Sequence, residues 1–180
     1  MNKYNDNLNI PITLEQLLEA KECRARTQRL LIDKYRLPLI SLTIMAVGQV
    51  KLTSDTILVG DAILEQLKQS FNDNIVYTCV TQLPTGYNAM LVVNGDVFDI
   101  KRTCVNIEHS HPLGRLSDID VLGLDYIPLT RQQVGQPART CLMCQQDAHI
   151  CVRAKTHSQQ QLNQCIQTII TAYQSKDNHV

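Results

Sequence analysis

Catalytic side-chain types are concentrated in one short stretch of the sequence, from Glu108 to Asp120. Near its end, Asp118 and Asp120 alternate with apolar residues, and this period of two predicts a strand. On a strand the two aspartates point the same way, about 6–7 Å apart at Cα. Carboxylates that close repel each other unless a cation or a proton intervenes. Because Mg²⁺ prefers oxygen ligands and usually brings phosphate oxygens with it, the spacing predicts metal-assisted phosphoryl or nucleotidyl chemistry with both aspartates as metal ligands.

A solvated face of an edge strand is the common explanation of an isolated Asp-x-Asp. The turn marked by Pro112 and Gly114, directly before the strand, favours the functional interpretation. His109 and His111 are candidates for a general base, a phosphate ligand or a metal ligand, and a hydrogen-bonded loop pair is the alternative. Arg115 could bind a phosphate through a two-pronged contact or could simply pair with the carboxylates.

Length and composition indicate one globular domain over residues 1–180, because 44% of the residues are hydrophobic and 19% are charged. The formal net charge is zero, which argues against a nucleic-acid polymer as partner but allows a small anionic ligand at a local basic patch. The N-terminus lacks the apolar core of a signal peptide, and the most apolar run, residues 37–47, is shorter than the ~20 residues that a membrane helix needs. The seven cysteines are expected to be reduced thiols in the cytoplasm.

The order of the elements follows from periodicity and from capping signals. Residues 1–12 are expected to be a loose tail, and Thr13 with Gln16 has the capping-box spacing that starts a helix over 13–36. The middle of this helix, around Arg24, is basic and is either a solvated face or a cluster that faces phosphate. Further strands are predicted over 39–47, 75–83, 89–93, 116–122 and 125–129, and further helices from Thr53 or Ser54, over 95–108, 138–154 and 158–174. The predicted fold class is α/β of the α+β type, a mixed sheet flanked by helices with a helical C-terminus.

The C-terminal part contains a second set of candidate ligands, Cys141, Cys144, Cys151 and His157. Three thiolates and an imidazole make a complete tetrahedral zinc set. The three cysteines, however, fall on one stripe of the helix predicted over 138–154, which would separate the first and last of them by about 15 Å. Zn–S bonds of ~2.3 Å do not span that distance. The sequence therefore favours buried thiols, with zinc as the alternative.

Several segments together resemble one family. The stretch Glu108-His-Ser-His-Pro-Leu-Gly-Arg-Leu-Ser-Asp-Ile-Asp120 is followed by Arg139-Thr-Cys-Leu-Met-Cys144, by Cys151-Val-Arg153 and by Lys155-Thr-His157. In this order they closely resemble the apo-citrate lyase phosphoribosyl-dephospho-CoA transferases, also called holo-citrate-lyase acyl-carrier-protein synthases. The resemblance covers the whole chain.

The resemblance implies a nucleotidyltransferase-type reaction. The donor would be 2′-(5″-triphosphoribosyl)-3′-dephospho-CoA, and the acceptor a serine hydroxyl on the acyl carrier subunit (gamma chain) of apo-citrate lyase. Pyrophosphate would leave, and a phosphodiester would join the prosthetic group to the serine. The alternatives are the same transfer to a malonate decarboxylase carrier subunit, and a zinc-stabilised module that binds a carrier protein without catalysis.

The resemblance also implies roles for single residues. Gly114-Arg115 with Asp118 and Asp120 is similar to the Gly-Ser and Asp-x-Asp of polymerase-β-type nucleotidyltransferases, although the two motifs are closer together here than is usual in that superfamily. The aspartates would hold Mg²⁺, while Gly114 and Arg115 would bind the donor. Arg24 would join them if the basic middle of the first helix faces phosphate. Further catalytic candidates are Arg115, Glu108, His109 and His111. The candidates for a third carboxylate are Asp96, Asp99, Glu108 and Asp125. The candidates for a basic face that docks the carrier are Lys101, Arg102, Arg131, Arg139, Arg153 and Lys155.

Overall fold

The computed structural model describes residues 7–177, in which four strands form one antiparallel sheet with the order β2-β3-β1-β4. The strands are β1 (Leu39–Ile44), β2 (Ile75–Leu83), β3 (Gly86–Val93) and β4 (Ser117–Leu122). The helices are α1 (Leu14–Tyr35), α2 (Ser54–Phe71), α3 (Val97–Ser110), α4 (Ala148–Ala154) and α5 (Gln159–Asp177). The predicted α+β class and the helical C-terminus are confirmed, and the strand directions are antiparallel throughout instead of mixed.

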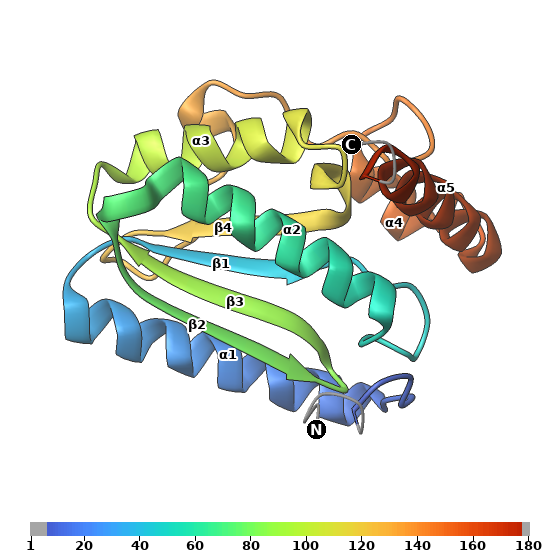
Figure 1. Ribbon diagram of the computed structural model, residues 1–180, viewed down its shortest axis with the longest axis horizontal. Coiled ribbons are helices and arrows are strands. Elements are labelled where there is room, and N and C mark those ends of the chain that lie inside the picture. Colours follow the sequence, from blue (N-terminus) through green and yellow to red (C-terminus); the bar gives the residue numbers. More distant parts are fainter. Residues whose placement is uncertain (1–6, 178–180) are drawn as a thin grey trace.

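The sheet separates two layers of helices (Figure 1). α2 and α3 cover one face, where alternate strand residues such as Leu42, Leu91 and Ile119 form the larger hydrophobic core. α1 covers the other face, where its Ile32 belongs to a smaller core with Leu39. Because neighbouring residues of a strand point to opposite faces, β4 buries Ile119 and Val121 in the larger core and turns Asp118, Asp120 and Leu122 toward the face that α1 covers.

Most of the predicted elements are confirmed. Thr13 forms the predicted capping box at the start of α1, and Thr53 caps α2 in the same way. The hairpin of β2 and β3 is also present. β1, however, ends at Ile44, and the segment 125–129 pairs back onto β4 only through a bridge between Leu122 and Pro128. None of the helices within residues 7–177 is both long and apolar enough to cross a membrane.

The prediction of a loose N-terminal tail is wrong for residues 9–12. The Asn9 N–H donates to the carbonyl of Leu52 at 2.9 Å, and the Ile12 N–H donates to the carbonyl of Gln49 at 3.0 Å. The side chain of Ile12 is also buried. These contacts hold this segment against the chain that leads into α2; residues 1–6 lie outside the described part.

The prediction of one helix over 138–154 is wrong in its first half. That part is a loop closed by an antiparallel bridge between Thr140 and Asp147, and α4 begins only after Asp147, whose side chain caps its first turn. A continuous helix would need the carbonyls of Thr140 and Cys141 for its own hydrogen bonds. Both carbonyls instead accept from the guanidinium of Arg115, so a contact with a residue distant in sequence replaces the helical pattern.

Candidate functional site

The two aspartates of β4 lie on one face of an edge strand. Ile119 between them is buried on the opposite face. β4 pairs with β1 in a register that places Asp118 opposite Thr43 and Asp120 opposite Ser41. The side chain of Asp118 is 65% exposed, whereas Asp120 is half-buried. The strand therefore presents one exposed and one sheltered carboxylate to the same space.

The electrostatics of the pair are those of two like charges held close together. Burial raises the pKa of Asp120, and the negative charge of Asp118 raises it further, while the positive charges of Lys101 and Arg24 act in the opposite direction. A divalent ion near both carboxylates would relieve this repulsion. Mg²⁺ binds carboxylate oxygens and keeps several of its waters. A pair with one sheltered and one exposed carboxylate offers such oxygens and leaves the ion open to water. The residues present therefore fit the predicted ion.

Two cavities adjoin the aspartate pair. The larger one, about 1190 Å³, is lined by Asp118 and Asp120, by the segments 128–132 and 138–142, and by parts of α4 and α5. The smaller one, about 490 Å³, lies between α1 and the sheet. Asp118 and Thr43 line both cavities. The more exposed carboxylate thus lies at the boundary of two spaces that could hold different parts of one ligand.

Glu108 is a buried carboxylate near the end of α3 that also lines the larger cavity. Its Oε1 accepts the backbone N–H of Ile119 at 3.0 Å, and its Oε2 is paired with the guanidinium of Arg131. Arg139 Nη1 lies 3.7 Å from Oε1. Glu108 therefore joins α3, β4 and two arginines, which is a positioning role; a direct catalytic role stays a prediction.

The other candidates for a third carboxylate are used elsewhere. Asp96 caps α3 by accepting two backbone N–H groups, at 2.9 and 3.1 Å. Asp99 forms an exposed ion pair with Arg102, and Asp125 accepts a backbone N–H within its own turn. None of these three lines either cavity. Of the four candidates for a third carboxylate, Glu108 alone lines the larger cavity with the aspartate pair.

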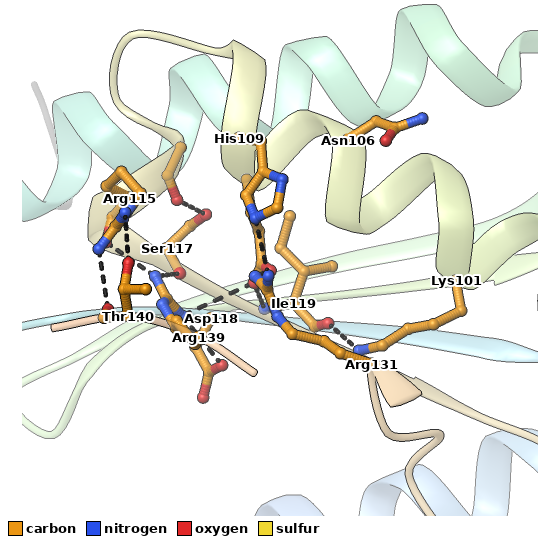
Figure 2. Close-up of polar contacts among 12 residues, drawn as sticks. Lys101, Asn106, His109, Arg115, Ser117, Asp118, Ile119, Arg131, Arg139 and Thr140 are labelled. Atoms are coloured by element: carbon orange, nitrogen blue, oxygen red, sulfur yellow. Dashed lines mark hydrogen bonds and ion pairs between the residues drawn. The ribbon is translucent and has the colours of Figure 1, made fainter. Parts of the chain in front are cut away.

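Two arginines that the sequence suggests only for a carrier-docking face belong to the site. Arg139 Nη2 donates to the carbonyls of Arg115 and Ser117 at 2.8 and 2.7 Å, and its Nη1 lies 3.5 Å from Asp118 Oδ1 (Figure 2). Arg131 lies on the other side of the same network and also lines the larger cavity. Both follow β4 through a long loop, so no local spacing points to these contacts; the family-like segment that starts at Arg139 is the one available signal.

The two histidines are not brought together. Arg131 Nη1 donates to His109 Nε2 at 2.8 Å (Figure 2), and partial burial together with the charge of Arg131 lowers the pKa of His109. His111 ends α3 and accepts the Leu113 N–H on Nδ1 at 3.1 Å. Its ring centroid lies 5.9 Å from that of Tyr173 in α5, and burial lowers its pKa. His109 therefore touches the arginine network, whereas His111 faces α5.

Arg115 lines the larger cavity, but its guanidinium holds the loop before α4. Its Nη2 donates to the carbonyls of Thr140 and Cys141 at 2.9 and 3.1 Å, and its Nη1 lies 3.3 Å from the Thr140 hydroxyl (Figure 2). These hydrogen bonds connect the turn before β4 with the cysteine-containing loop. The contact of Arg115 with a phosphate stays a prediction.

Gly114 is required by packing against α3. A Cβ atom at this position would lie 2.4 Å from the carbonyl oxygen of Ile107 and 2.8 Å from that of Glu108. Backbone atoms of a helix cannot easily give way. Gly114 lines neither cavity, so its predicted contact with the donor has no support from this position.

Replacing Gly114 by Ala is expected to lower the free energy of unfolding by about 1–3 kcal/mol or more, because the added methyl group overpacks a rigid site. Urea unfolding followed by circular dichroism measures the change. Gly95→Ala is the matched control, since a Cβ there would lie 3.6 Å from its nearest neighbour, the Cδ1 of Ile100. Equal unfolding midpoints for the two variants would contradict the packing role.

The basic residues predicted to face phosphate or a carrier protein lie in different places. Lys101 is buried and donates to the carbonyl of Ile119 at 3.0 Å, so its prediction as part of a docking face is wrong. Arg24 lines the smaller cavity with Lys21 and Lys51. Burial and the charge of Lys21 lower the pKa of Lys51, as expected where cations gather. The candidates that remain exposed are Arg102, Arg153 and Lys155.

The four candidate zinc ligands converge, against the expectation from a continuous helix. Ligand atoms of Cys141, Cys144, Cys151 and His157 all lie within 4.8 Å of one another. The loop that replaces the first half of the predicted helix brings them together. The long separation of Cys141 and Cys151 along a continuous helix, which argued against a metal site, therefore does not occur.

Known proteins with similar sequences share one description. A family model described as apo-citrate lyase phosphoribosyl-dephospho-CoA transferase matches residues 12–173. The chain is 36% identical over 154 residues to a probable apo-citrate lyase phosphoribosyl-dephospho-CoA transferase of Vibrio cholerae serotype O1 (strain M66-2), covering 83% of this chain and 86% of that relative. It is 33% identical over 149 residues to an apo-citrate lyase phosphoribosyl-dephospho-CoA transferase of Escherichia coli O139:H28 (strain E24377A / ETEC), covering 81% of each. The matched residues include every part of the site described above.

Proposed function

Because the chain belongs to the apo-citrate lyase phosphoribosyl-dephospho-CoA transferase family, we propose that it attaches the prosthetic group of citrate lyase. The donor is 2′-(5″-triphosphoribosyl)-3′-dephospho-CoA, and the acceptor is a serine of the apo acyl carrier (gamma) subunit. The observation that supports this most is the aspartate pair on one face of β4, with Asp118 at the boundary of two cavities.

The proposed reaction is a nucleotidyltransferase-type substitution at phosphorus. The serine oxygen bonds to the phosphorus next to the ribose, the bond from that phosphorus to the pyrophosphate oxygen breaks, and the serine proton passes to a carboxylate of the cavity. Negative charge gathers on the non-bridging oxygens and on the leaving pyrophosphate. Asp118 and Asp120 would hold Mg²⁺, which neutralises such charge when bound.

The two cavities suit the two ends of the donor. Lys21, Arg24 and Lys51 line the smaller cavity, where Asp118 is the one acidic residue among residues 7–177 of the lining, so we place the triphosphate there. Phosphate oxygens are attracted by such a group of cations. The larger cavity, which is lined by apolar residues and also by Arg115, Arg131 and Arg139, has room for the dephospho-CoA portion, and its apolar residues suit the less polar pantetheine arm. Its apolar lining residues include Ile44, Met45, Val47, Leu142 and Leu162.

Replacing Arg24 by Ala is expected to raise the KM for the donor about tenfold or more, since a hydrogen bond to a charged group contributes about 1.5–3 kcal/mol. The kcat should change less, because a contact made equally in the ground state and the transition state affects binding and not turnover. Steady-state kinetics with saturating apo-carrier measure both constants. Arg26→Ala is the control, because Arg26 is exposed on the same helix and lines neither cavity. A donor KM that is equal in the two variants would contradict the placement of the triphosphate.

Release of pyrophosphate tests the proposed function. The enzyme is incubated with apo-carrier, Mg²⁺ and donor, and pyrophosphate is measured with a coupled assay. We expect one pyrophosphate per carrier, and none when the acceptor serine of the carrier is replaced by Ala. Binding of the carrier without pyrophosphate release would support the binding-module alternative. Faster release with a malonate decarboxylase carrier than with the citrate lyase carrier would contradict the acceptor assignment.

A further inference from the structure

A group of three thiols and one imidazole lies outside the proposed reaction centre. Cys141 and Cys144 lie in the loop before α4, Cys151 lies on α4, and His157 lies between α4 and α5. Their ligand atoms are all within 4.8 Å of one another, and the sulfur atoms of Cys144 and Cys151 are 3.5 Å apart. Bonds of ~2.3 Å to one central ion place tetrahedral thiolate sulfurs a little under 4 Å apart, so the cluster already has nearly that size.

The thiols are close enough to act on one another. Two of the three are buried, and the sulfur atoms of Cys144 and Cys151 are 3.5 Å apart. Thiolates this close cannot all be charged without a cation between them. A divalent ion would allow all three to lose their protons.

The imidazole supplies an independent observation. His157 Nε2 is buried and has no hydrogen-bond partner among the described residues. A buried nitrogen without a partner is costly unless something binds it. A metal ion held by the adjacent sulfurs could bind Nε2 of a neutral imidazole. The other ring nitrogen, Nδ1, would then keep its proton.

We propose that Cys141, Cys144, Cys151 and His157 bind one structural Zn²⁺ ion. Four protein ligands complete a tetrahedral shell and leave no open position for water or substrate, which distinguishes a structural from a catalytic zinc. Soft thiolate and imidazole donors also select zinc over Mg²⁺, which prefers oxygen. Three thiol protons are released on binding and no electron is transferred.

The zinc would fix one wall of the larger cavity. Cys141, Leu142, Cys151 and His157 all line that cavity. The guanidinium of Arg115 donates to the carbonyl of Cys141, and Arg115 itself lies in the short helical turn directly before β4. Zinc loss should therefore loosen both the wall and the approach to the aspartate pair. This effect on transfer rests on the proposed function, whereas the zinc content does not.

Metal analysis of the untreated full-length chain is the test. The protein is purified under reducing conditions with a tag that contains no histidine, and its metals are measured by inductively coupled plasma mass spectrometry. We expect one zinc per chain, and tetrahedral cobalt–thiolate absorption after exchange with Co²⁺. Folded, reduced protein without zinc and without that cobalt spectrum would overturn the proposal. Iron in place of zinc, or a disulfide between Cys144 and Cys151, would also overturn it.

Paired variants assign the ligands. His157→Ala should weaken zinc binding by more than about tenfold, since even outer partners of ligands cost 10–100-fold, as measured by competition with a chromogenic chelator. His157→Cys should retain one zinc, because four thiolates also complete the shell. His149→Ala and Cys165→Ser are the controls, since neither residue belongs to the cluster. Equal zinc affinity in His157→Ala and His149→Ala would contradict the assignment. If transfer is never detected but zinc is present, the proposed function fails and the zinc site stands.

Discussion

Replacing Asp120 by Asn is expected to slow transfer by about a thousandfold or more, because charge stabilisation at phosphorus contributes several kcal/mol and each ~1.4 kcal/mol is tenfold in rate. Asn keeps the size of the side chain and its hydrogen-bonding shape but removes the charge that would hold Mg²⁺. The exposed partner Asp118 alone should bind the ion weakly. Single-turnover transfer over a range of Mg²⁺ concentrations measures the loss.

The same substitution should not destabilise the protein. Burial and the charge of Asp118 raise the pKa of Asp120 in the folded state, so the folded state binds this proton more tightly than the unfolded state does. The stability that comes from this proton is present below the unfolded pKa and is lost as the pH rises through the folded pKa. A neutral Asn does not suffer that loss. We therefore expect a melting temperature at pH 7, without Mg²⁺, equal to or above that of the wild type.

Asp125→Asn is the matched control for Asp120→Asn. Asp125 is exposed in the turn after β4 and lines neither cavity, so its replacement should leave the transfer rate unchanged. The proposal would be contradicted by an Asp120→Asn protein that transfers at the wild-type rate with the same Mg²⁺ dependence. It would also be contradicted if both variants lost activity to the same extent.

Replacing Glu108 by Ala is expected to lower the free energy of unfolding by about 3–5 kcal/mol, the usual cost of removing one partner of a buried ion pair. The side chain of Glu108 is 4% exposed, and that of Arg131 is 13% exposed. Its loss would leave the backbone N–H of Ile119 without its acceptor, would leave Arg131 without its carboxylate partner, and would deprive Arg139 of a nearby charge. Urea unfolding measures the change, and Glu108→Gln should fall between the wild type and Glu108→Ala.

Asp99→Ala is the comparison for Glu108→Ala on the same helix. Asp99 pairs with Arg102, but the two side chains are 73% and 52% exposed, and exposed pairs contribute only about 0–1 kcal/mol. We therefore expect the unfolding midpoint of Asp99→Ala to stay close to that of the wild type. If Glu108→Ala lost no more stability than Asp99→Ala, Glu108 would not be the link between α3, β4 and the arginines.

The parts of the fold that depend on local signals could be predicted from the sequence. The period of two locates β4 and sets Asp118 and Asp120 on one face, and Thr13 marks the start of α1. The loop before α4 could not be predicted in this way. Its cysteines follow a helical stripe without Gly or Pro, whereas the carbonyls of Thr140 and Cys141 accept hydrogen bonds from Arg115, which is 25 residues away from Thr140.

The candidate site shows the same division. The spacing of the central stretch finds the aspartate pair and Glu108, which line one cavity. It does not separate the two histidines, because their different surroundings depend on the position of α5 and of Arg131. It also does not show that Arg131 pairs with Glu108, because the two residues are 23 positions apart in the sequence. These contacts depend on packing between residues that are far apart in the sequence, so local periodicity does not predict them.

The intact mass of the acyl carrier subunit tests the central claim most directly. Apo-carrier of citrate lyase is incubated with the enzyme, Mg²⁺ and the triphosphoribosyl donor, and its mass is compared with that of untreated carrier. We predict a gain equal to one phosphoribosyl-dephospho-CoA group, located on a single serine, with the wild-type enzyme and almost none with Asp120→Asn in the same time. A carrier that binds the enzyme but keeps its mass, or that gains the group equally fast with Asp120→Asn, would contradict it.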